Sequence, residues 1–258
     1  MAEYNSADEQ WLILNYRPTS LFSLRMTHAT SKGGRTLLVP TPYAVKLALI
    51  DACFRCFAGN EAYQRSRQVY EWIKGMEIRF RPPAHCVVQN TFVKIKQQER
   101  NAPAGIYSPT IAYREFCYFN GDLEIALNVT GIEDTAIQIL STVATHITYL
   151  GKRGSFMQFI SARTFNGLLP QGYTCPEDKA DIANGSYGTT HYLDDFGEEL
   201  IKEAGGFDRI NSFSQKSSTL GKYRVLTRTL IPYRPVSSGK HYTYYKRLPA
   251  NNHPTIGS

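Results

Sequence analysis

The chain has few cysteines, and it contains no apolar run long enough to cross a bilayer. Its 258 residues include five cysteines, which are too few and too scattered for a disulfide framework. Cys53 and Cys56 form a C-x-x-C motif, but it lies within a predicted helix and no second pair follows at zinc spacing. We therefore interpret the cysteines as small buried residues, with zinc or redox use as the alternative.

Motifs of catalysis are also absent from the sequence. No G-x-S-x-G, Walker A or H-E-x-x-H motif occurs, and no histidine has metal-ligand spacing to another histidine, cysteine or carboxylate. We therefore expect neither a metal nor a cofactor. A metal-independent ribonuclease needs only a base, an acid and a cation, and His28, Tyr43 and Lys32 supply these groups in principle. The sequence favours a non-catalytic protein, with such an endoribonuclease as an alternative.

The first ten residues, MAEYNSADEQ, are polar and acidic, unlike a secretory signal. Because no long apolar run follows, we expect a cytoplasmic protein without a membrane partner. The length fits one large domain or two small ones, and 42% hydrophobic residues are enough to build a core.

Charge is distributed unevenly around a net value of +7. Residues 177–208 carry nine acidic and two basic side chains, whereas residues 209–258 carry nine basic side chains and no acidic one. Five tyrosines are interleaved with the basic residues of this tail, at positions 223, 233, 242, 244 and 245. Such a tail can bind phosphates and stack on bases. The alternatives are a solvated face, a surface for an acidic protein, and internal pairing with the acidic segment.

Residues 34–58 predict a basic loop that runs directly into a helix. Thr41 suits the N-cap position, and Pro42 fits the first helical position, where no N–H is needed. A helix start surrounded by cations favours a phosphate, so nucleic acid is the first partner to consider. The cations expected there are Arg25, Lys32, Arg35 and Lys46.

Two further basic groups point to the same partner. Lys94 and Lys96 are two residues apart in a predicted strand and therefore face one side, and Arg100 follows in a turn-rich tip. Lys152 and Arg153 lie between two glycines just after a predicted helix, where the backbone can approach a phosphate closely. A basic loop can also be merely solvated, so the argument depends on these groups being neighbours in the fold.

Hydrophobic periodicity predicts an α+β fold. The order of elements matches a ferredoxin-like (RRM-like) βαββαβ body over residues 1–165, with helices on one face of the sheet and the other face free. An irregular, β-rich C-terminal extension covers residues 166–258. The dipeptide Asn120-Gly121 predicts a hairpin between two of the strands. The expected strands are 11–25, 76–81, 86–96, 111–119, 123–129, 156–160 and 220–232, and the expected helices are 42–58, 61–74, 133–150 and 194–204.

Two segments of the chain resemble a known family. Residues 39–46 read V-P-T-P-Y-A-V-K and are followed by A-L-I-D-A, and residues 150–156 read L-G-K-R-G-S-F. Over residues 11–165 the chain resembles the CRISPR-associated Cas5 family, which belongs to the RAMP superfamily. The resemblance implies a ferredoxin-like body with a protruding β-hairpin thumb near 84–118. It also implies a subunit that caps the 5′ handle of the crRNA in a type I Cascade complex.

The resemblance further implies partners and site residues. The partners would be the crRNA, a Cas7-like backbone subunit and a Cas8-like large subunit, in RNA-guided DNA targeting for antiviral defence; contact with target DNA near the PAM stays open. Rival functions are a metal-independent endoribonuclease that processes precursor crRNA and a general RRM-like RNA binder, although no RNP1 string occurs. The RNA-binding residues would be Arg25, Lys32, Arg35 and Lys46 on handle phosphates, Tyr43 stacked on a base, Lys94, Lys96 and Arg100 on or near the thumb, and Lys152 and Arg153 along the RNA backbone.

Overall fold

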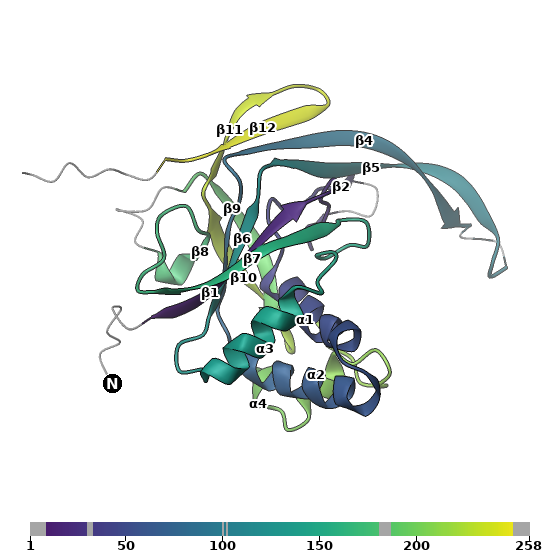
Figure 1. Ribbon diagram of the computed structural model, residues 1–258. Coiled ribbons are helices and arrows are strands. Elements are labelled where there is room, and N and C mark those ends of the chain that lie inside the picture. The colour runs from purple at the N-terminus through teal and green to yellow at the C-terminus, as the bar shows by residue number, and fades with distance from the viewer. Residues whose placement is uncertain (1–8, 30–32, 100, 102, 181–186, 250–258) are drawn as a thin grey trace, which may run out of the picture.

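The computed structural model describes residues 9–29, 33–99, 101, 103–180 and 187–249 (Figure 1). These residues form mixed sheets and helices, which confirms the predicted α+β class. The main helices gather on one side of the molecule, and a long β-hairpin projects from the opposite end (Figure 1). In the ranges described, no helix combines the length and apolar character needed to span a membrane.

The central sheet has the strand order β3-β6-β1-β7, and every neighbouring pair in it is antiparallel. Two helices, α1 (Pro42–Cys56) and α2 (Gly59–Ile73), lie between β1 and β3 in the chain, and α3 (Asp134–Ala144) lies between β6 and β7. The strands of this sheet are β1 (Gln10–Pro18), β3 (Ile78–Arg81), β6 (Leu123–Asn128) and β7 (Met157–Asn166).

The first half of β1 is buried on both faces, so the sheet face predicted to be free is covered in part. Leu12, Leu14 and Tyr16 belong to the main core, and the Tyr16 hydroxyl donates to the Ala144 carbonyl at 2.7 Å. Trp11 and Ile13 lie on the other face and pack in a second cluster with Tyr173 from the C-terminal extension. The sequence WLIL is apolar at successive positions, as expected of a strand that is covered on both sides.

The start of α1 follows the prediction from its sequence. Thr41 is the N-cap, and its side-chain oxygen accepts a hydrogen bond from the Ala44 N–H at 3.1 Å. Pro42 occupies the first turn. The apolar face of the helix packs into the core through Val45, Leu49 and other buried residues.

A second sheet is built around a long hairpin of β4 (His85–Gln98) and β5 (Tyr107–Asn120). The predicted Asn120-Gly121 hairpin is wrong, because β5 pairs with β4 along its whole length, whereas β6 joins the central sheet. Gly121, with φ at +123°, instead lies between strands of two different sheets. The strand order is β11-β12-β4-β5-β2, with β11 (Tyr233–Ser238), β12 (Tyr242–Arg247) and β2 (Gly33–Gly34).

The C-terminal extension adds a third sheet, whose basic residues pair with the acidic segment. Arg228 lies 2.9 Å from Glu177, and Arg224 and Arg209 form ion pairs with Asp194 and Glu203. Of the alternatives left open for the tail, internal pairing therefore accounts for these three arginines. The elements of this region are β8 (Cys175–Pro176), β9 (Thr189–Phe196), β10 (Arg224–Ile231), α4 (Glu198–Lys202) and the short 3-10 helices Glu177–Lys179 and Gly206–Arg209.

A buried ion pair fastens this extension to α1. Lys46 is 1% exposed, and its Nζ lies 2.7 Å from Asp195 Oδ1 and 3.2 Å from the Lys74 carbonyl oxygen. Burial lowers the pKa of Lys46 and raises the pKa of Asp195, while the attraction between the two charges opposes both shifts. Each charge therefore depends on the other for compensation inside the protein.

We predict that Lys46→Met lowers the free energy of unfolding by about 3 kcal/mol, because it leaves the Asp195 carboxylate without its buried partner. Urea unfolding of the full chain at neutral pH measures this loss. The double variant Lys46→Met/Asp195→Leu removes both charges and should recover most of the stability. A single variant as stable as the wild type would contradict the assignment of this pair as the fastening contact.

Candidate nucleic-acid interface

Three loops that carry predicted RNA-binding cations meet at one edge of the molecule. The Ser23 N–H donates to Ser155 Oγ at 3.0 Å, which joins the segment before Arg25 to the glycine-rich loop. The Met26 N–H donates to the Arg35 carbonyl at 2.9 Å, which joins the same segment to the loop before α1. The structure thus brings together the loops of Arg25, Arg35 and residues 150–156.

The glycine-rich loop holds its cations in solvent beside the hairpin. Gly151 has φ at +75°, and a Cβ there would lie 3.0 Å from Leu24 Cδ1, so glycine permits both the turn and the close approach. Lys152 and Arg153 are exposed. The Lys152 Nζ lies 5.9 Å from the centre of the Phe116 ring on β5, close enough for a cation–π contact.

The segments that contain Arg25 and Arg35 both run beside β5. Both arginines are exposed, and the residues next to Arg35 are tied to β5: Gly34 pairs in parallel with Arg114, and the Thr36 N–H donates to Glu115 Oε2 at 2.9 Å. The segments of Arg25 and Arg35 therefore lie along the edge of β5.

The outer part of the hairpin carries an exposed aromatic pair beside its lysines, a feature that the sequence analysis missed. Phe92 and Tyr113 pair across the strands with ring centres 4.0 Å apart, and both are more than half exposed. Lys94 and Lys96 follow at alternate positions and therefore share this face. The sequence could have predicted this face, because Phe92, Lys94 and Lys96 occupy alternate positions of one predicted strand. Exposed rings beside cations can stack on bases or pack against a partner.

Two of the expected site residues do not join this surface. Lys46 is buried against Asp195, so its expected contact with handle phosphates is wrong. Tyr43 is engaged within the protein: the Arg224 guanidinium carbon lies 4.2 Å from its ring centre, and burial raises the pKa of its hydroxyl. Lys32 and Arg100 lie outside the described residues.

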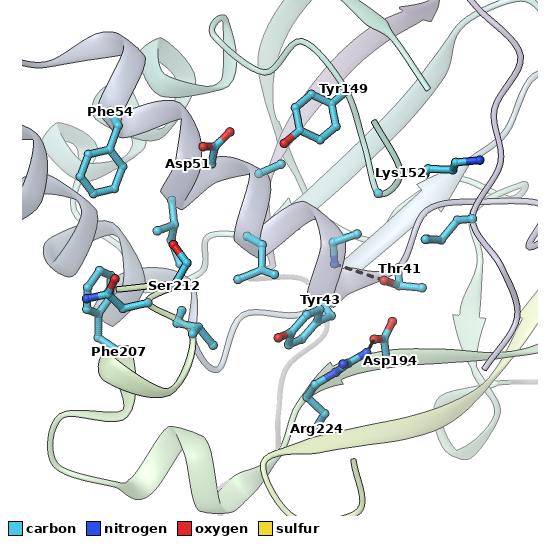
Figure 2. Close-up of a pocket in the computed structure, with 18 of the residues that line it drawn as sticks. Thr41, Tyr43, Asp51, Phe54, Tyr149, Lys152, Asp194, Phe207, Ser212 and Arg224 are labelled. Carbon is cyan, nitrogen blue, oxygen red and sulfur yellow. Dashed lines mark hydrogen bonds and ion pairs between the residues drawn. The ribbon is translucent and has the colours of Figure 1, made fainter. Parts of the chain in front are cut away.

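A cavity of about 790 Å³ runs along the exposed side of α1 and reaches the glycine-rich loop (Figure 2). Tyr43, Phe54 and Tyr149 line it, and Lys152 stands at its border (Figure 2). The opposite wall comes from residues 207–213 of the C-terminal extension. Its volume and its mixture of rings with few polar groups are typical of ligand sites.

Of the suggested catalytic set, the structure describes His28 and Tyr43. Tyr43, the expected acid, is covered by Arg224, and Lys32 lies outside the described residues. Burial lowers the pKa of another histidine, His191, to about 4, and the charge of His28 adds to this shift. Among the described residues no group of three or more histidine, cysteine or acidic side chains is placed to hold a metal ion.

Comparison with known proteins gives one relative of similar length. The chain is 26% identical over 209 residues to the CRISPR-associated protein Cas5 of Archaeoglobus fulgidus, an alignment that covers 81% of this chain and 87% of that protein. No family model matches the sequence.

Solved structures with some likeness to the chain include a CRISPR protein from Archaeoglobus fulgidus, with a TM-score of 0.45 and 11% identity over 93% of this chain and 92% of that one. Another is a chain of a CRISPR RNA-guided surveillance complex, with a TM-score of 0.39 and 15% identity over 85% and 88% of the two chains. The sequence similarity to the curated Cas5 protein confirms the resemblance of this chain to the CRISPR-associated Cas5 family.

Proposed function

We propose that this protein is a non-catalytic RNA-binding subunit of a type I CRISPR effector complex and that it caps the 5′ handle of the crRNA. The observation that carries the proposal is the joining of three loops at one strand edge, which sets Arg25, Arg35, Lys152 and Arg153 around a single surface. Such a set of exposed cations suits one sugar–phosphate strand. The similarity to a Cas5 protein supports the choice of crRNA over other RNAs.

The proposal includes a ferredoxin-like body. The strand order β3-β6-β1-β7, with helices between β1 and β3 and between β6 and β7, agrees with the βαββαβ arrangement. In this arrangement the inserted β4–β5 hairpin acts as the thumb, and Phe92 and Tyr113 contact the guide or a Cas7-like subunit beside it. A Cas8-like subunit is the third proposed partner.

The cavity beside α1 has a place in the same proposal. A handle is single-stranded, so its bases are free to leave the stack and to enter pockets. If Lys152 binds a handle phosphate, the neighbouring base can enter this cavity and stack on the rings of Tyr149 and Phe54. Tyr149 therefore replaces Tyr43 as the proposed stacking residue.

We predict that Lys152→Ala/Arg153→Ala weakens binding of single-stranded repeat RNA and reduces the slope of log K against log salt by about 1.4, because two phosphate contacts are lost. Fluorescence anisotropy between 50 and 300 mM chloride measures the slope. The control variant Arg65→Ala/Lys202→Ala removes two charges elsewhere and should keep the wild-type slope. Equal slopes for all three proteins would rule out phosphate contacts by the glycine-rich loop.

We also expect that the purified protein leaves repeat RNA intact during incubation without divalent metal, because Tyr43, the expected general acid, is covered by Arg224. Denaturing gel electrophoresis of end-labelled RNA is the measurement. Discrete products that disappear in a His28→Ala variant would instead establish the metal-independent endoribonuclease.

A further inference from the structure

A second basic site lies at the opposite edge of the hairpin sheet. A cavity of about 370 Å³ opens beside the end of β3 and the paired strands β11 and β12. None of the described residues that line it is acidic. Four of them are cationic: Arg81, Arg234, Lys246 and Arg247.

Arg81 and Arg247 converge on one glycine inside this cavity. A Cβ at Gly172 would lie 3.5 Å from Arg81 Nε and 3.6 Å from Arg247 Cδ, so both side chains pack at contact distance against this glycine. The Arg81 Nε is buried and has no hydrogen-bond partner among the described residues. Burial and the charge of Arg81 both lower the pKa of Arg247.

Arg234 and Lys246 add two charges that nothing in the described structure compensates. They are directly opposite in the register of β11 and β12, where like charges destabilise the strand pair. Neither side chain forms an ion pair within the ranges described. The carboxylate that pairs with Arg81 at 3.4 Å, Glu124, is shared with Arg163 at 3.9 Å.

We propose that this cavity binds a phosphate group. A phosphate in this cavity would pair with the exposed Arg234 and Lys246 side chains and would offset the repulsion of the four cations, as charge-assisted hydrogen bonds do. The sheet order places β4 and β5 between β12 and β2, so the site lies about 14 Å across the sheet from the strand next to Arg25 and Arg35. It is therefore separate from the proposed crRNA surface and does not depend on that function.

The first test uses inorganic phosphate as the probe. Phosphate should raise the Tm of the wild type above its value in chloride of equal ionic strength. Because phosphate also stabilises proteins by exclusion from their surface, the deciding comparison is between variants. The variant Arg234→Gln/Lys246→Gln should lose most of the phosphate-induced rise in Tm and should bind phosphate at least tenfold more weakly. The control variant Lys240→Gln, in the turn between β11 and β12 but outside the cavity, should keep the rise in Tm.

The same double variant should have a higher Tm than the wild type at low salt without phosphate, because it removes the opposed cations. Equal phosphate shifts in the double variant and in Lys240→Gln would overturn the proposal. Salt titration with single-stranded RNA then identifies the source of the phosphate. A slope reduced by about 1.4 in the double variant assigns a nucleic-acid strand, and an unchanged slope with a lost phosphate shift assigns a free phosphate or small phosphorylated ligand.

Discussion

The buried ion pair between Lys46 and Asp195 is the contact on which the arrangement of the site depends. It joins the first helix of the body to β9 of the extension, and it compensates the charge of a lysine that is 1% exposed. Next to it, Arg224 reaches from β10 to Asp194 and covers the ring of Tyr43. These contacts set the extension against α1, and the cavity along α1 exists because residues 207–213 are held opposite the helix.

The cations of the chain fall into two groups, according to whether a carboxylate lies within ion-pair distance. Arginines of the tail that have carboxylates within reach serve to fold the extension, as Arg209 and Arg228 do. The cations proposed to bind phosphates lie at two edges of the hairpin sheet, around the loops near Arg25 and around the cavity of Arg81. The acidic segment thus offsets part of the positive charge of the tail.

The projecting hairpin is buried at its base and carries exposed rings further along the same face. Cys86, Val88 and Cys117 are buried near the body, whereas Phe92 and Tyr113 further out on the same face are exposed. Pairing through fourteen residues of each strand, together with the contact of β2 at Tyr113 and Arg114, supports the hairpin beyond its buried base. An apolar pair left in solvent beside two lysines is a feature of a surface that functions when covered by a partner.

The sequence by itself determined the elements and their chemistry: the Thr41-Pro42 start of α1, the glycine-rich loop at 150–156 and the resemblance to Cas5. These features depend on periodicity, caps and turns, which act over a few residues. Only the tertiary structure decided which segments meet. Strand β5 pairs with β4 and not with β6, although Asn120-Gly121 is a typical hairpin turn. Lys46 is buried against Asp195, which lies far away in the sequence, and is therefore not on the surface. Pairing and burial depend on contacts between segments far apart in the chain, which no local pattern specifies.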